Sequence, residues 1–424
     1  MLGTIWDSCT KLTMSSFITY TCVLFFGLGA WLSINSVYTQ LPLLVDVLPE
    51  QWGFATLMVC VLQAVCLLSI IYAYFASKSK HLKQGNIPAT IVLCAMNIGA
   101  LLLSAFVYKQ TVVIGGTEHS LYFLISIAIM SLPCTMSDVI FLPFISRFKS
   151  NNLVITFFLG MGLSALIPAL GTFIQGTEGV SNVTLPVVFA NGTSGFEEYQ
   201  LKTHPLFDVK QFLVGISIIA SIPLFAFLVL IRQLKTDKRL QDDTVAWPHP
   251  GINTKYIDDS LSRPRWFAYL ILVACVGGIQ NSIIPSIIPY ATNHLGPDAY
   301  HLANTLYIIV NPLFCFFPFL LRIRKFRYHG AIFSVTILCV ATIFMYACIP
   351  EIAKTDAWYI NPIIYLAIST LSGFLSWQRA AIGETLRRAN EKSGLFFCGT
   401  FIQIGSCTGA AIMILLTNVF KVFD

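Results

Sequence analysis

Residues 53–77 read GFATLMVCVLQAVCLLSIIYAYFAS, a stretch of 25 residues without a charged side chain. A membrane-spanning helix needs about 20 mostly apolar residues, because every backbone N–H and C=O must be satisfied inside the segment. The composition of the whole chain agrees: 56% of its 424 residues are hydrophobic and 11% are charged, whereas soluble domains are roughly 25% charged. The sequence therefore predicts an all-α membrane protein embedded in the lipid bilayer.

Ten further apolar runs are bounded by charged or turn residues in the same way. The first run in the chain is long enough to tilt strongly or to break at Pro42. Each run is a predicted helix, because only helical hydrogen bonds satisfy the backbone within one segment. Together the runs predict about eleven spans, near residues 16–44, 53–77, 88–108, 120–145, 152–176, 208–231, 266–290, 302–321, 330–349, 357–377 and 395–420.

Lysine and arginine are unevenly divided between alternate loops. One set of loops holds 21 of the 26, and the other set holds five. Because cytoplasmic loops retain positive charge, the amino terminus is predicted to be cytoplasmic and, after an odd number of spans, the carboxyl terminus extracellular. The net charge of +6 follows from this topology and does not indicate a nucleic-acid partner.

Two loops differ from the rest in composition. The loop 177–207, on the predicted extracellular side, contains the sequons Asn182-Val-Thr184 and Asn191-Gly-Thr193, so we expect Asn182 and Asn191 to be glycosylated. The segment 234–264 is polar and contains Pro248 and Pro250, which is typical of a cytoplasmic linker. These features predict a six-helix bundle over residues 1–233 and a five-helix bundle over residues 265–424.

Short matches between the two predicted bundles support this division. Phe157-Phe-Leu-Gly160 begins the fifth span of the first bundle, and Phe396-Phe-Cys-Gly399 begins the fifth span of the second. Parallel halves with a central site occur in carriers of the major-facilitator and equilibrative-nucleoside-transporter kind. We therefore expect a 6+5 arrangement of that kind, with a site at the midplane between the bundles.

Ionisable residues are scarce inside the predicted spans, where they usually face a cavity or each other. Asp138 is the one acidic residue well inside a span, and no Lys or Arg is expected at its depth. We expect it either to bind substrate or sense protons, or to be a carboxyl hydrogen-bonded to neighbouring helices. All seven histidines lie in loops or at span ends. The sequence therefore predicts no metal site, no cofactor, no ATP-driven pump and no enzyme.

Amide and aromatic side chains gather in the first and seventh spans, close to the prolines of those spans. Amides donate and accept hydrogen bonds without carrying charge, and Trp or Tyr can stack on a ring, so this set suits a neutral planar solute. The alternative for any one of them is a hydrogen bond between helices, worth about 1 kcal/mol. The residues are Trp31, Asn35, Tyr38 and Gln40 in the first span, and Gln280 and Asn281 in the seventh.

The stretch Gly27-Leu-Gly-Ala-Trp31-Leu-Ser-Ile-Asn35-Ser-Val-Tyr-Thr-Gln40-Leu-Pro42 resembles the first span of the eukaryotic riboflavin transporter family. The resemblance extends over essentially the whole chain and includes Asn311-Pro312 and Gln403-Ile-Gly405-Ser406. It implies eleven spans, a plasma-membrane location and carrier-mediated uptake of riboflavin without ATP. It also adds Asn311 and Gln403 to the candidate substrate contacts.

Three positions depart from the pattern expected of that family. Gln40 stands where a glutamate is expected, Asp138 where an asparagine is expected, and Met161 where a glutamine is expected. The first two departures change the charge of a side chain inside a span. A relative with a shifted pH dependence, affinity or substrate preference would therefore fit the same sequence.

We hypothesise a facilitative carrier that rocks two bundles about a midplane site, where aromatic rings stack on the flavin and amides bind its pyrimidine-like edge. The scarcity of ionisable pairs within spans motivates the facilitative mode. The nearest alternative is a nucleoside or nucleobase carrier, because the same amides would bind those rings, and a more distant one is a membrane receptor that does not transport. The candidate substrate-binding residues are Trp31, Asn35, Tyr38, Gln40, Asp138, Gln280, Asn281, Asn311 and Gln403.

Overall fold

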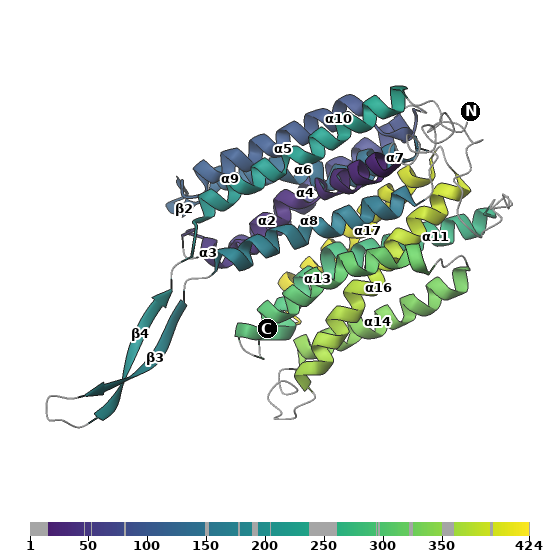
Figure 1. Ribbon diagram of the computed structural model, residues 1–424. Coiled ribbons are helices and arrows are strands. Elements are labelled where there is room, and N and C mark those ends of the chain that lie inside the picture. Colours follow the sequence, from purple (N-terminus) through teal and green to yellow (C-terminus); the bar gives the residue numbers. More distant parts are fainter. Residues whose placement is uncertain are drawn as a thin grey trace, which may run out of the picture.

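Long helices packed side by side make up most of the computed structural model of the chain (Figure 1). We call residues 16–236 the first half and residues 261–423 the second half. The structure describes residues 16–45, 47–51, 53–79, 82–148, 152–176, 179–188, 194–203, 205–236, 261–293, 295, 297–321, 325–349, 360–390 and 393–423.

The first half begins with a bent helix. The segment Ser16–Leu28 turns by 49° into α2 (Leu32–Thr39), so the first span is bent well before Pro42. A second break follows α2 at Gln40, and Pro42 lies in the separate short helix that comes next, as expected for a span that ends in a broken segment there. The other helices of this half are α3 (Leu41–Val45), α4 (Gly53–Ala76), the 3₁₀ turn η1 (Leu82–Gln84), α5 (Ile87–Val107), α6 (Leu121–Met136), the π turn η2 (Ser137–Phe141), α7 (Leu142–Ile145), α8 (Leu153–Gln175), α9 (Val209–Ile219) and α10 (Ser221–Thr236).

The second half also consists of long helices packed side by side (Figure 1). Its elements are α11 (Arg263–Gly278), the π turn η4 (Ile279–Ile283), α12 (Ile284–Asn293), α13 (Pro297–Leu320), α14 (Phe326–Cys348), α16 (Ile360–Ala389), α17 (Gly394–Ile414) and the π turn η5 (Leu415–Val419).

Capping residues fix where two of these helices begin. The side chain of Asn86 accepts a hydrogen bond from the backbone N–H of Ala89 at the start of α5. Asp208 and Gln211 form a capping box at the start of α9, in which each side chain accepts from the other's backbone N–H. Such caps satisfy N–H groups that have no partner inside the helix, so both starts are specified locally by the sequence.

The predicted all-α membrane fold is confirmed, although the number of spans depends on how α16 is counted. Among the described residues, nine helices are long and apolar enough to cross a membrane, and the bent pair of Ser16–Leu28 with α2 makes a tenth. Helix α16 is long enough at 30 residues, but Arg379, Glu384, Arg387 and Arg388 make its second half polar. It contains residues 360–377 of the predicted span 357–377 and continues to Ala389, whereas residues 357–359 lie outside the described residues.

Two antiparallel ribbons occupy loops between helices. The short one pairs β1 (Val112–Ile114) with β2 (Thr117–His119). The long one pairs β3 (Gly179–Val188) with β4 (Ser194–Thr203), and it projects from the helices in the predicted loop 177–207 (Figure 1). Asn182 lies in β3 opposite Gln200, whereas the second predicted glycosylation site, Asn191, and most of the predicted linker 234–264 lie outside the described residues.

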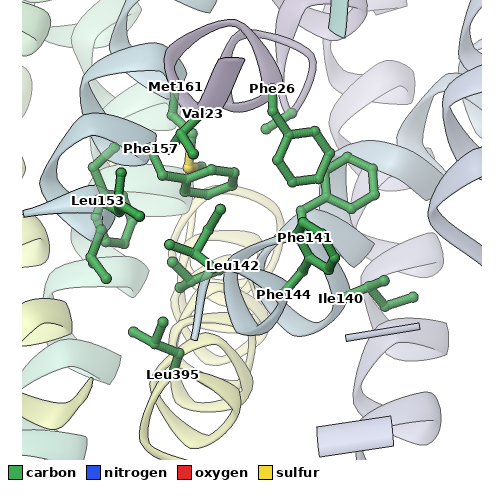
Figure 2. Close-up of a cluster of buried hydrophobic side chains, with 14 of the residues drawn as sticks. Val23, Phe26, Ile140, Phe141, Leu142, Phe144, Leu153, Phe157, Met161 and Leu395 are labelled. Atoms are coloured by element: carbon green, nitrogen blue, oxygen red, sulfur yellow. The ribbon is translucent and has the colours of Figure 1, made fainter. Parts of the chain in front are cut away.

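The two halves share a hydrophobic core at one end of the helices. We call this the amino end, because Ser16 lies there with the starts of α8 and α17, and we call the other the hairpin end, where α8 leads to β3. At the amino end, Val23, Phe26 and Phe157 of the first half belong to one buried cluster with Leu395 and Phe396 of the second. Figure 2 shows Leu395 reaching this cluster from α17.

At the hairpin end the cores are separate. One buried cluster there contains only residues of the first half, such as Leu44, Phe54 and Phe123. Another contains only residues of the second half, such as Ile288 and Tyr346. Apolar contact therefore holds the halves together at the amino end, while each half has its own core at the hairpin end.

Glycines allow two helices of the first half to approach closely. A Cβ atom added to Gly160 of α8 would overlap the backbone carbonyl oxygen of Leu24, and one added to Gly27 would overlap that of Phe157. Small residues serve this purpose at helix contacts in membranes, where association depends on close packing and not on exclusion of water.

We therefore expect Gly160→Ala to lower the stability of the purified protein by about 1–3 kcal/mol, the usual effect of overfilling a packed interior. Gly99→Ala in α5 is the matched control, because an added Cβ there meets no atom within 4 Å. Thermal unfolding in detergent measures both. Equal melting temperatures for the two variants would contradict the close approach of α8 to the first helix.

Candidate transport site

A cavity of about 200 Å³ lies between the two halves. Its walls come from α2, α4 and α8 on one side and from η4, α12, α13 and α16 on the other. The lining combines neutral polar groups with rings and contains one charged side chain. The polar residues are Asn35, Thr39, Gln280, Asn281, Asn304, Asn311, Ser376 and Arg379, and the aromatic ones are Trp31, Tyr38, Phe158 and Tyr307.

Six of the nine predicted substrate contacts line this cavity. They come from both halves, so residues about 250 positions apart in the sequence face the same space. Met161, one of the three departures from the family pattern, lines it as well. The six predicted residues are Trp31, Asn35, Tyr38, Gln280, Asn281 and Asn311.

Two asparagines of the lining are held in the same way in the two halves. Asn35 Nδ2 donates to Ser164 Oγ of α8 at 3.2 Å. Asn281 Nδ2 donates to Ser406 Oγ of α17 at 2.9 Å. Asn35 belongs to the first span of the first half, and Asn281 belongs to the first span of the second half. Each bond connects that span to α8 or α17, the two helices whose starts contain the Phe-Phe-X-Gly sequence. The bonds fix the rotamer of each amide and leave its carbonyl oxygen and second N–H for other partners.

Gln280 and Trp31 bring unpaired polar atoms to this region. Gln280 Nε2 donates to Ser376 Oγ at 3.3 Å, and the backbone oxygen of Gln280 accepts from Tyr307 Oη at 3.2 Å. Gln280 Oε1 and Trp31 Nε1 are buried without a hydrogen-bond partner among the described residues. Since an unsatisfied buried group costs about 1–3 kcal/mol, a ligand that supplies a donor and an acceptor here gains affinity.

Gln40, a further predicted contact, lies outside the lining. It is fully buried at the hairpin end of α2, where its Nε2 donates to Gln175 Oε1 at 2.6 Å and to Thr172 Oγ1 at 3.3 Å. Gln175 in turn donates to the backbone oxygen of Phe207 at 2.9 Å. These bonds join α2, the end of α8 and the start of α9, which favours a role for Gln40 in holding the wall.

Asp138 also lies outside the lining, and the expectation that no Lys or Arg lies at its depth is wrong. Arg379 Nη2 donates to both carboxylate oxygens of Asp138, at 2.8 and 3.0 Å, and the carboxylate is fully buried. The predicted span ended at residue 377 and so placed Arg379 at the membrane edge. Helix α16 instead continues through this position, because no proline follows Pro362 before the helix ends at Ala389.

Gln403, the ninth predicted contact, completes this buried group. Its Nε2 donates to Asp138 Oδ2 at 2.8 Å, and its Oε1 accepts from Cys66 Sγ at 2.9 Å. Asp138 and Cys66 belong to the first half, whereas Gln403 and Arg379 belong to the second. The group therefore bonds the halves to one another on the amino side of the cavity.

Two π turns position the polar residues, and they have the same relation to proline. Asp138 lies in η2, which ends two residues before Pro143, and Gln280 and Asn281 lie in η4, which ends two residues before Pro285. Proline has no N–H, so the carbonyl four residues earlier loses its helical partner. A π turn shifts the hydrogen bonding at that point, and such turns are frequent at functional sites. Spacing to proline is thus a sequence signal for both.

Four further lining residues were not predicted from the sequence, namely Arg379, Ser376, Tyr307 and Asn304. Tyr307 and Asn304 precede Asn311 by four and seven residues on α13, which places all three on one helix face. Ser376 and Arg379 are related in the same way on α16. Helical spacing from Asn311 would have predicted Tyr307 and Asn304, and a tenth span that continued past residue 377 would have placed Arg379 inside the membrane.

Comparison with known proteins identifies the family of this chain. The family model described as solute carrier family 52, riboflavin transporter, matches residues 15–424. The riboflavin transporter rft-1 of Caenorhabditis elegans is 30% identical and covers 97% of this chain and 98% of its own length. Riboflavin transporter member 3 of the same solute carrier family from Homo sapiens is 29% identical, over 96% of this chain and 97% of its own length.

Solved structures share the fold at low sequence identity. The proton:xylose symporter XylE of the major facilitator superfamily has a TM-score of 0.58 at 12% identity and covers 97% of this chain and 93% of its own. A bacterial homologue of the iron transporter ferroportin in its outward-facing state has a TM-score of 0.56 at 14% identity, over 95% and 92% of the chains. The fold is that of major-facilitator transporters, and the chain belongs to solute carrier family 52, the riboflavin transporter family.

Proposed function

We propose that this chain carries riboflavin across the plasma membrane into the cell by alternating access. The observation that carries the proposal is the cavity between the halves, lined by amides and rings from both, in a chain of this family. A flavin is a neutral planar ring system whose pyrimidine-like edge alternates acceptors with a donor. Asn35, Gln280, Asn281 and Asn311 offer matching groups, and Trp31 and its aromatic neighbours offer stacking surfaces.

The size of the cavity bears on how a flavin would enter. Ligand pockets commonly have volumes of about 300–1,000 Å³, and the cavity is smaller, at about 200 Å³. To enclose a flavin the cavity therefore has to widen, which happens if the halves part. The hairpin end offers the easier route, because the two halves have separate cores there, whereas they share one core at the amino end.

The buried Asp138–Arg379 pair contradicts the expected scarcity of ionisable pairs within the spans, which was the reason to expect a facilitative mode. We propose transport without catalysis and without ATP, and the proposal names no coupling ion. A nucleoside carrier is the alternative that shares the amide chemistry, and no contact in the cavity favours it over a flavin carrier.

The proposed orientation has the amino end in the cytoplasm and the hairpin end outside. Its support is the concentration of Lys and Arg in one set of loops, together with the two sequons of the β3–β4 loop. An outward-facing entrance would then lie on the hairpin side of the cavity, where uptake from the medium requires it.

Cells that express the chain are expected to take up labelled riboflavin above the background of control cells. Lumiflavin should compete, because it keeps the ring, whereas uridine and adenosine should not. Background uptake despite normal surface amounts would overturn the proposal, and competition by uridine would select the nucleoside carrier. Binding without accumulation in liposomes would select the receptor.

Asn35→Ala and Asn281→Ala should each weaken apparent riboflavin affinity about three- to tenfold, the effect of losing one hydrogen bond of about 0.5–1.5 kcal/mol. The matched control is Asn97→Ala, which removes a buried amide of α5 that is not part of the lining. Concentration-dependent uptake, divided by surface abundance, separates affinity from folding. Unchanged affinity in both cavity variants would show that these asparagines only join helices and do not contact the substrate.

The orientation predicts that enzymatic removal of N-linked glycans increases the electrophoretic mobility of the protein from cells. The double substitution Asn182→Gln and Asn191→Gln should abolish that change, because it removes both acceptor amides. Each single variant reports its own site. A wild-type protein that reaches the plasma membrane without any glycan would leave the loop 177–207 unmodified and contradict this prediction.

A further inference from the structure

Arg379 borders both the cavity and the closed amino end. It lines the cavity with Ser376, which lies one turn earlier on α16. Only its Nη2 bonds to Asp138, and its Nε has no hydrogen-bond partner among the described residues. The guanidinium also lies over the ring of Phe158, 5.2 Å from the centroid. Because a guanidinium has five N–H donors, Arg379 has donors left for a molecule in the cavity. We call the amino side of the cavity, where Arg379 lies, its floor.

The pair that holds Arg379 crosses between the halves. Asp138 belongs to η2 of the first half, and both of its partners, Arg379 and Gln403, belong to the second. Directly beside it, a Cβ atom on Gly399 of α17 would overlap the backbone oxygen of Asp138. We call Asp138, Arg379 and Gln403 the latch. The halves cannot part at the amino end unless the latch opens.

Opening the latch in an empty protein is unfavourable. Asp138 is fully buried and Arg379 is 6% exposed, so separating them leaves two charges in a medium that solvates them poorly. Removing the partner of a buried charge is strongly destabilising for this reason. A molecule that offers Arg379 an acceptor replaces part of the lost interaction, and the cavity is where such a molecule would lie.

We propose that Arg379 is a substrate contact at the floor of the cavity and that substrate binding there releases its bond to Asp138. The ligand chemistry is a carbonyl acceptor on the edge of a planar ring. Since Asp138 balances the charge of Arg379, the floor suits a neutral molecule. The inference rests on the proposed function for the identity of that molecule, and it makes Arg379 the residue that couples occupancy of the cavity to opening of the amino end.

The first test measures riboflavin affinity of the purified protein through quenching of flavin fluorescence. Arg379→Gln should raise the Kd at least about tenfold, because hydrogen bonds to charged groups are the stronger ones. Asp138→Asn still offers Arg379 an amide oxygen as an acceptor but removes the carboxylate that competes with substrate, so the Kd should stay unchanged or fall. The matched control is Arg388→Gln, which lies on the same helix but bonds to Glu384 and is absent from the lining.

The second test measures efflux of labelled riboflavin from sealed membrane vesicles with the hairpin end outside. After release, the empty wild-type carrier must break the latch to return, so external unlabelled riboflavin should accelerate efflux several-fold, as expected when loaded carriers reorient faster than empty ones. In Asp138→Asn the empty carrier returns without breaking an ion pair, and the acceleration should fall close to one. Arg388→Gln should keep the wild-type value.

The outcomes separate the two proposals. Wild-type protein that does not bind riboflavin would overturn the proposed function. Wild-type binding with an unchanged Kd in Arg379→Gln, or with undiminished acceleration in Asp138→Asn, would overturn the latch alone. Should Arg379→Gln fail to fold, the double variant Asp138→Asn with Arg379→Gln takes its place, because it leaves neither charge without a partner, and it should show both the weakened binding and the lost acceleration.

Discussion

Polar groups inside a membrane find their hydrogen-bond partners within the protein, because lipid supplies none. This constraint accounts for the long helices and also for the treatment of the side chains on them. Hydroxyls of the spans bond back to carbonyls of their own helix, as Ser131 does to Ile127 and Ser376 does to Ser372. The amides of the cavity bond to serines of neighbouring helices. Gln280 Oε1 has no hydrogen-bond partner among the described residues, and Gln280 lines the cavity, where a solute can supply one.

The two ends of the molecule differ in how the halves meet. At the amino end, apolar side chains of α17 enter the core of the first half, and the buried group around Asp138 adds charged hydrogen bonds across the same boundary. At the hairpin end each half keeps its own core. A carrier that exposes its site to one side at a time requires such a difference between its ends, because the halves must separate at one end while they stay in contact at the other.

Proline and the π turn solve a second difficulty, which is how to place polar residues in an otherwise regular helix. In η2 and η4 the wide turn precedes a proline at the same spacing, and it carries Asp138 in one case and Gln280 with Asn281 in the other. The carbonyl freed by proline is accommodated within the protein interior, where other groups are close. The two halves therefore use one local device, once to bond the halves together and once to line the space between them.

Much of this protein is determined locally. The apolar runs, bounded by charged residues, predicted the helical membrane fold. Six cavity residues were predicted from the amides and aromatic rings of the spans, because polar groups are too costly in lipid to be placed without a partner. The pairing of Asp138 with Arg379, 241 residues away, could not be predicted in this way. Nor could the separation of Gln40 and Gln403 from the cavity, although they are the same residue type as Gln280. Sequence states which groups need partners; only the packing of helices from both halves decides which partner each group finds.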